Sequence, residues 1–510
     1  MHMKLTVVGD INKYYVQTLC MIFFPGAKFS EKEEPDENMP SVFLSLEEKE
    51  EEFIAEAVIR ARGREARMTR SAKKGGRSDQ RTAKIAAGSA MFAAGKELFG
   101  FTPPWGILTG VRPAKVASEY LLNGLGVQKI KEIFRDEYFV NPKKAALAVS
   151  IASAEIKLTK KLPKNLCSVY ISIPFCPSRC AYCSFVSYTS KRLLSLIDDY
   201  LLMLYKDIDH VFSLIRELGM QVATIYIGGG TPTILDDRQL ETLLSHIARH
   251  TDVSNLMEYT LEAGRPDTIT AEKLAIAKKY GINRISVNPQ SLCDGVLETI
   301  GRKHTALDFL RAFDIAKNSG ISRINTDLIA GLPGDSFAEF SKSIDRVIEL
   351  RPDNLTVHTF CVKKSSDVLK NSSNIYSLTG GEVWKSVDYS QVRTRNSGYK
   401  PYYMYRQKNT VGNLENVGYS LEGAEGMYNI FMMEELHTIF AAGAGSVTKL
   451  VKYRSPKEGG SKITRIFKPK YPYEYLRDFE KLQAGDAEAG ILSMRDKILA
   501  FFEENGVPVN

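Results

Sequence analysis

The chain has 510 residues, 44% hydrophobic and 25% charged, with a formal net charge of +8. This length predicts about two to four structural units, and the composition excludes global disorder. No run reaches the roughly 18 uncharged apolar residues of a membrane span, and seven cysteines do not form the even framework of a secreted disulfide-rich protein. The sequence therefore predicts a multi-domain cytoplasmic protein with reduced thiols.

Residues 1–165 begin with an apolar strand at 5–8, a helix at 14–24 and a second strand at 41–46. Helical patterns dominate after that, and the last helix is predicted at 143–160. We interpret this part as an N-terminal α/β accessory domain.

Ten basic residues lie close together between Arg60 and Lys84. We interpret this basic segment mainly as a solvated helix face and a mobile loop around Gly75 and Gly76. A surface for nucleic acid or an anionic substrate is the alternative.

From residue 166 to 362, short apolar runs alternate with amphipathic helical stretches, a pattern typical of βα units around a parallel sheet. Strands are predicted at 169–173, 223–227, 258–262, 284–288, 323–329 and 354–360. We predict an α/β fold, a partial TIM-like (β/α)6 barrel, with its chemistry in the loops at the carboxyl ends of the strands. Residues 363–510 are predicted to form a C-terminal region that covers the substrate.

Cys176, Cys180 and Cys183 lie on one short loop after the first barrel strand. Three thiolates on such a loop can bind three irons of a [4Fe–4S] cluster and leave the fourth iron open. A closed zinc site needs four ligands, and no cysteine or histidine follows until His210, which disfavours zinc. Unligated core cysteines are a further alternative.

The C-x3-C-x2-C spacing resembles the signature of the radical S-adenosylmethionine (SAM) superfamily. That resemblance implies that SAM binds the open iron and that reduction by one electron cleaves it to a 5′-deoxyadenosyl radical. Motifs over residues 167–449 resemble the coproporphyrinogen III dehydrogenase-like branch. The turns at 104–113 and the segment 405–419 resemble its Z-type subfamily.

The resemblance also implies roles for residues near the strand ends. The expected cofactor pocket comprises Tyr170 beside the sulfonium, Tyr182 against adenine, Gly229, Gly230 and Thr231 at the methionine moiety, Glu262, Gln290 and Arg302 at the ribose and methionine carboxylate, Asp327 near the cofactor, and Cys361 at a second cofactor site. Tyr170, Arg302 and Asp327 are the expected catalytic residues. A tight turn at the glycines, a surface carboxylate at Glu262 and a small buried filler at Cys361 are the simpler alternatives. Asp327 also interrupts an apolar strand, where an unpaired carboxylate is costly unless it has a function.

The implied reaction converts coproporphyrinogen III to protoporphyrinogen IX by oxidative decarboxylation of two propionates, with two SAM molecules consumed. Arg112, Arg406 and Lys408 could pair with propionates, or could be solvated loop charges. Two positions depart from the family pattern. Ser172 stands where the wider branch has histidine, and Phe185 where the best-known dehydrogenases have a fourth cysteine.

Three alternatives stay open at this point. The protein could be a haem carrier, with His358 and His437 as plausible axial ligands, or a haem-modifying enzyme of the same branch. An RNA-modifying radical enzyme would use the basic segment, although nucleic acid is the less favoured partner. The expected partners are a porphyrinogen-type substrate and a reductant such as flavodoxin or ferredoxin, with the protein itself a monomer.

Overall fold

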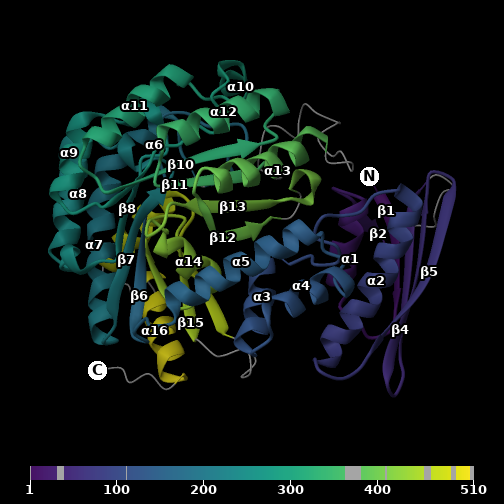
Figure 1. Cartoon of the computed structure of the whole chain (residues 1–510). Helices are drawn as coiled ribbons and strands as arrows, with labels where there is room; N and C mark the ends of the chain where they lie inside the picture. The colour runs from purple at the N-terminus through teal and green to yellow at the C-terminus, as the bar shows by residue number, and fades with distance from the viewer. Residues whose placement is uncertain are drawn as a thin grey trace.

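The computed structural model describes residues 2–30, 39–110, 112–185, 187–361, 381–407, 410–452, 461–483 and 490–505. These residues form one sheet of five strands and one of eleven. Figure 1 shows the smaller, N-terminal sheet at one side of the molecule and the larger sheet lined by helices on the other. Within the described segments, no helix combines the length and the apolar character needed to cross a membrane.

The five-stranded sheet has the order β2-β1-β3-β4-β5. Its strands are β1 His2–Val8, β2 Lys28–Ser30, β3 Ser41–Glu48, β4 Glu52–Ala61 and β5 Arg64–Lys73. Helices α1 Lys13–Phe23 and α2 Asp79–Phe99 pack with it, and α3 Pro113–Leu122, α4 Val127–Asp136 and α5 Pro142–Thr159 follow. Ser78 caps α2 at its start and Gly100, in the left-handed conformation, ends it.

The hairpin of β4 and β5 corrects the prediction for the basic segment. Residues 52–73 are strands rather than helix, because Phe53, Ala55 and Ala57 alternate with polar residues and face the core at a period of two. Two of its basic residues form cross-strand ion pairs, Arg60 with Glu65 and Arg67 with Glu56, the second at 3.0 Å. The expected loop at the two glycines is a turn into α2, in which both have positive φ.

Six parallel strands lie side by side in chain order and confirm the predicted α/β fold and partial barrel. They are β6 Leu166–Ile173, β7 Gln221–Gly229, β8 Glu258–Glu262, β9 Arg284–Ser286, β10 Arg323–Ala330 and β11 Asn354–Thr359. The outer helices are α6 Lys191–Leu194, α7 Ile197–Glu217, α8 Asp237–Ala248, α9 Ala271–Lys279, α10 Asp294–Thr299, α11 Ala306–Asn318 and α12 Phe337–Leu350. Each long helix buries one stripe; in α8 it is Leu240, Leu243, Leu244 and Ile247, at helical spacing.

The C-terminal part extends this sheet at both ends. Strands β12 Lys400–Arg406 and β13 Glu415–Ser420 are antiparallel and join the sheet at β11. At the other end β14 Ile439–Ala442 pairs parallel with β6, and β15 Val447–Lys452 and β16 Lys462–Phe467 follow. Helices α13 Gly381–Asn396, α14 Met427–Glu434, α15 Pro472–Gln483 and α16 Gly490–Glu503 complete the fold. The domain boundaries at 165/166 and 362/363 stay predictions.

A buried glutamate fastens the N-terminal part to the barrel. Glu415, at the start of β13, accepts hydrogen bonds from Lys144 at 2.7 Å, Trp105 at 2.8 Å and Gln391 at 2.7 Å. Desolvation alone would raise the pKa of Glu415, but the charge of Lys144 and these hydrogen bonds hold it below its usual value. The carboxylate is therefore fully satisfied inside the protein.

Candidate active site

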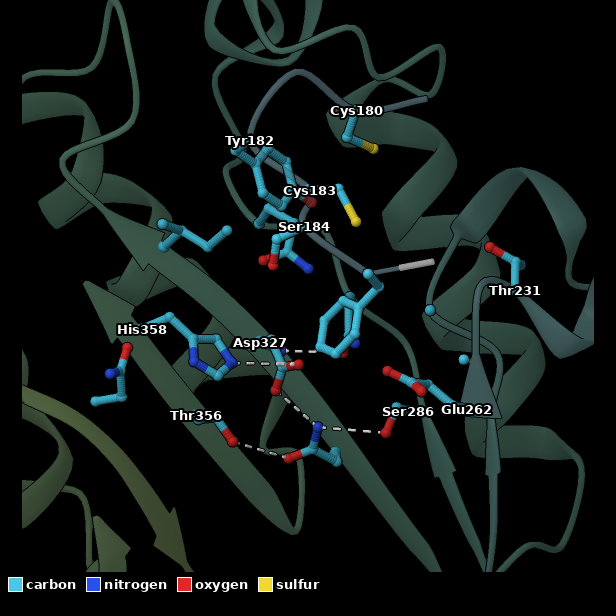
Figure 2. A pocket seen from close by; sticks show the side chains of 18 of the residues that line it. Cys180, Tyr182, Cys183, Ser184, Thr231, Glu262, Ser286, Asp327, Thr356 and His358 are labelled. Carbon is cyan, nitrogen blue, oxygen red and sulfur yellow. Dashed lines mark hydrogen bonds and ion pairs between the residues drawn. The ribbon is translucent and has the colours of Figure 1, made fainter. Parts of the chain in front are cut away.

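A cavity of about 350 Å³ opens at the carboxyl ends of the barrel strands. Of the residues expected in the cofactor pocket, all except Tyr170 line it: Cys176, Cys180, Tyr182, Cys183, Gly229, Gly230, Thr231, Glu262, Gln290, Arg302, Asp327 and Cys361. Figure 2 shows the cysteine loop at one end of this cavity and Asp327 with His358 at the other. One cavity thus joins the cysteines to a polar far end.

The cysteine loop is held by backbone hydrogen bonds at both of its ends. The N–H of Cys176 donates to the carbonyl of Tyr188 at 3.0 Å, and that of Ala181 donates to Ile300 at 2.9 Å. Desolvation raises the pKa of the Cys176 thiol to about 11, partly offset by its contact with the Thr231 hydroxyl at 3.3 Å. Metal binding replaces the thiol proton, so three thiols converging on one cavity fit a cluster that takes thiolates.

The glycine turn after β7 packs directly on the start of the cysteine loop. The N–H groups of Gly230 and Thr231 donate to the carbonyls of Ile173 and Phe175, each at 2.8 Å. A Cβ at Gly230 would come within 2.4 Å of the Phe175 carbonyl oxygen, and Gly229 has φ +111. Glycine is required at both positions, because the turn must approach the loop that carries Cys176.

Glu262 ends β8 and lies half-buried in the cavity wall. Desolvation, reinforced by the charge of Asp327, raises its pKa to about 8. No lysine or arginine of the described residues forms an ion pair with it. Its carboxyl group is thus available to the hydroxyls of a ligand.

Gln290 is held in an unusual conformation at the cavity wall. Its φ is +69, and its N–H and carbonyl bond to Asp327 and Ile329 of β10 at 3.1 and 2.9 Å. The side-chain Oε1 is buried and accepts no hydrogen bond within the described chain. Because an unpaired buried acceptor is costly, this oxygen fits a hydrogen-bond donor of a bound cofactor.

Arg302 is buried and bridges three parts of the cavity wall. Its guanidinium donates to the Tyr182 hydroxyl at 3.0 Å, to the Asn288 carbonyl at 2.9 Å and to the Gly264 carbonyl at 3.1 Å. Only Nε lacks a partner among the described residues. Arg302 therefore fixes the Tyr182 ring over the cavity, and three of its five N–H groups are used in these bonds.

Asp327 lies next to His358, across the cavity from the cysteine loop (Figure 2). Asn325 donates to its Oδ1 at 2.8 Å, and the His358 Nε2 lies 3.6 Å from its Oδ2. Desolvation alone would raise the pKa of Asp327, but His358 and Asn325 bring it below the usual value. Tyr405 from β12 in turn contacts His358 Nδ1 at 3.1 Å. An ionised carboxylate thus lines the cavity across from the cysteine loop.

Comparison with known proteins agrees with this geometry. Residues 170–347 match the family model described as the radical SAM superfamily. The chain is 40% identical over 385 residues to the oxygen-independent coproporphyrinogen-III oxidase-like protein HemZ of Bacillus subtilis, covering 75% of this chain and 76% of that protein. The chain belongs to the HemZ-like family of radical SAM proteins. The superfamily uses SAM and a [4Fe–4S] cluster, which fit the three cysteines and the unpartnered cavity atoms described above.

Other relatives of this HemZ-like chain carry a different name. The heme chaperone HemW of Bacillus subtilis is 37% identical over 198 residues, which are 38% of this chain and 51% of HemW. Among solved structures, the coproporphyrinogen III oxidase HemN of Escherichia coli, titled a radical SAM enzyme, aligns with a TM-score of 0.44 and 19% identity, over 61% of this chain and 74% of that one.

Tyr170 does not line the cavity of this HemZ-like protein. Its ring stacks with Tyr226 and Tyr428, at centroid distances of 6.1 and 6.5 Å, behind the wall. His437 is also remote, because it is buried against Phe431 with its Nε2 2.8 Å from the Ser168 hydroxyl. Of the two histidines considered for haem, only His358 lines the cavity.

The arginines considered for propionates serve structural contacts. Arg406 donates to the carbonyl of Leu108 and to Asn413, and desolvation lowers its pKa to about 10. Arg112 pairs with Glu435 at 2.7 Å. Neither lines the cavity, and Lys408 lies outside the described residues.

Sequence reasoning missed the side chains of the far end. They include Glu258, Arg284, Tyr402, Tyr403, Tyr405, Asn429 and Met433. Arg284 pairs with Glu258 at 3.2 Å, across strands β9 and β8. Glu258 and Arg284 are the first residues of β8 and β9 and do not interrupt an apolar run as Asp327 does, so that signal could not have found them.

One further group of metal-type ligands lies away from the cavity, between α7 and α8. His246 and His250 each place Nε2 within 2.8 and 2.7 Å of one oxygen of Asp209. These are ordinary hydrogen-bond distances, so a carboxylate that accepts two imidazole N–H groups accounts for the arrangement.

Proposed function

We propose that this protein converts coproporphyrinogen III to protoporphyrinogen IX by oxidative decarboxylation of two propionates. The observation that carries the proposal is the single cavity that joins the cysteine loop to the ionised Asp327 and the tyrosine-lined far end. The name of the HemZ relative supports it. A porphyrinogen has four pyrrole N–H donors, and the ionised carboxylate of Asp327 in the cavity wall is a suitable acceptor for them.

In this proposal the residues around the cysteine loop bind SAM and orient it. When bound, the cluster and SAM would supply the radical chemistry that removes one hydrogen atom from a propionate β-carbon; the loss of CO2, and of one electron to an acceptor, would then leave a vinyl group. Tyr182, fixed by Arg302, covers the adenine, while Glu262 and Gln290 take the ribose hydroxyls. We keep Tyr170 as a positioning residue, since it supports Tyr226 from behind.

Propionate recognition must rest on neutral donors in the described part of the cavity. All three lining arginines are already engaged: Arg265 with Asp267 at 3.0 Å, Arg284 with Glu258, and Arg302 with Tyr182. The far end instead offers neutral hydroxyls and amides, from Gln407 and from Tyr405, whose hydroxyl contacts His358. We infer that the propionates bind these groups.

The test is anaerobic reconstitution with iron, sulfide, SAM and a reductant, followed by mass spectrometry of products from coproporphyrinogen III. We expect a loss of two CO2 and four hydrogens per molecule, absent in Cys176→Ala. Formation of 5′-deoxyadenosine without vinyl product would refute the assigned substrate while leaving the radical chemistry intact.

A haem carrier is the second function that a specific observation favours. His358 lines the cavity, and several relatives are named heme chaperones. This function predicts stoichiometric haem binding without turnover, visible as a Soret band that weakens in His358→Ala. Unchanged haem binding in that variant would remove the cavity as the haem site.

The RNA-modifying alternative loses its main support. Arg67, Arg77 and Arg81 of the basic segment pair with Glu56, Glu137 and Glu119, so their charges are partly neutralised. We retain a cytoplasmic monomer in the proposal, consistent with seven cysteines that form no disulfide.

A further inference from the structure

A patch of exposed aromatic side chains lies beside the cysteine loop. Tyr473 is 50% exposed and Tyr471 is 37% exposed, at the start of α15 and just before it. Phe185, two residues after Cys183, is 68% exposed. Large aromatic residues are costly to leave in water and are enriched in protein interfaces.

A stack of rings connects this patch to the cluster loop. The Tyr473 and Tyr471 rings are stacked at 5.4 Å, and Tyr471 lies 5.8 Å from Tyr188. The carbonyl of Tyr188 accepts the N–H of Cys176 at 3.0 Å. The patch therefore reaches a cluster ligand through two ring contacts and one hydrogen bond.

The same patch is positively charged. Lys191, Arg192, Lys470 and Arg477 are exposed, and none forms an ion pair with an acidic group of the described residues. Lys470 lies 5.8 Å above the Tyr471 ring. The acidic groups of this part of α15 are Glu474, whose carboxylate accepts the Tyr471 N–H at 3.4 Å, and Asp478, which follows Arg477. The excess of cations favours an acidic partner.

We propose that this patch docks a small acidic electron-carrier protein that reduces the cluster. One electron leaves the reduced carrier and one enters the cluster, with no bond made or broken. Opposite charges accelerate the encounter, and the aromatic rings supply the dry centre of a transient interface. The proposal rests on the cluster and not on the porphyrinogen substrate.

Reconstituted holoenzyme and reduced flavodoxin, an acidic carrier, provide the test. The variants are the charge reversal Lys470→Glu/Arg477→Glu and the truncation Tyr473→Ala. Lys278→Glu/Arg249→Glu, which reverses two exposed cations at the carboxyl ends of α9 and α8, is the matched control. The readouts are the rate of cluster reduction by electron paramagnetic resonance and the rate of 5′-deoxyadenosine formation.

We expect the patch reversal to slow flavodoxin-driven reduction by about tenfold or more at low salt, and the difference to shrink near 0.5 M salt because exposed charges are screened. Dithionite, which needs no docking site, should drive all variants equally. Equal flavodoxin rates in patch and control variants would overturn the proposal, as would an equal loss with dithionite. Neither readout requires a porphyrin product, so failure of the assigned substrate would leave this test intact.

Discussion

Glu415 and Glu262 lie in the same sheet, and together they show that the same residue type can serve two purposes. Glu415 is buried with three hydrogen-bond donors, including Lys144, and its pKa is lowered. Glu262 lines the cavity with no cation beside it in the described chain, and its pKa is raised to about 8. A carboxylate paired with a buried cation fastens two parts of the molecule together, whereas one that lines the cavity without a cation is available to a ligand.

Removing the partner of Glu415 should have the largest effect on stability. In Lys144→Met the carboxylate stays buried without its cation, which should lower the free energy of unfolding by about 3 to 5 kcal/mol. Denaturation by urea measures it. Lys143→Met is the matched control, because Lys143 is 75% exposed while Lys144 is 4% exposed. A loss of less than about 1 kcal/mol in Lys144→Met would show that Glu415 does not anchor the N-terminal part.

Glu262→Gln should have the opposite effect to Lys144→Met: it should weaken SAM binding and leave the free energy of unfolding unchanged. The amide keeps the shape but removes a charge-capable acceptor, so SAM should bind roughly tenfold to a hundredfold more weakly, about 1.5 to 3 kcal/mol. Equilibrium dialysis of the reconstituted protein measures the affinity. Glu298→Gln, on the exposed side of α10, should change neither quantity. An unchanged SAM affinity in Glu262→Gln would place the ribose elsewhere.

The pH dependence of stability should reveal the raised pKa of Glu262. With a folded pKa of about 8 against an ordinary value near 4.5, Glu262 keeps its proton in the folded protein while the unfolded chain loses it. The contribution of Glu262 to the free energy of unfolding is therefore complete below about pH 4.5, and it is lost as the pH rises toward 8. Urea midpoints of SAM-free wild-type protein should fall relative to Glu262→Gln over this interval. A difference that is constant with pH would mean that Glu262 is not perturbed.

That the expected cofactor residues share one cavity was predictable from the sequence, and the contacts of Glu415 were not. Cys176, Glu262 and Asp327 each follow or interrupt a strand of a regular βα pattern, and parallel strands bring their carboxyl ends to one edge. Trp105 and Lys144 meet Glu415 across 310 and 271 residues, and no local pattern encodes such a contact. The hairpin at 52–73 was missed because its basic residues suggested a solvated helix face, although its buried residues alternate.

The smallest expected effect on SAM binding is that of replacing Gln290. It tests whether a buried side-chain oxygen without a hydrogen-bond partner is reserved for the cofactor. Its backbone already bonds to β10, so Gln290→Met should leave that geometry in place and remove only the unpartnered Oε1. We expect an unchanged or slightly higher free energy of unfolding and SAM binding weakened by roughly fivefold, about 1 kcal/mol. Gln221→Met, at the exposed start of β7, is the control. If Gln290→Met instead lowered stability while SAM affinity held, the buried oxygen would be part of the scaffold, and an unpaired acceptor would no longer mark the cofactor side of this cavity.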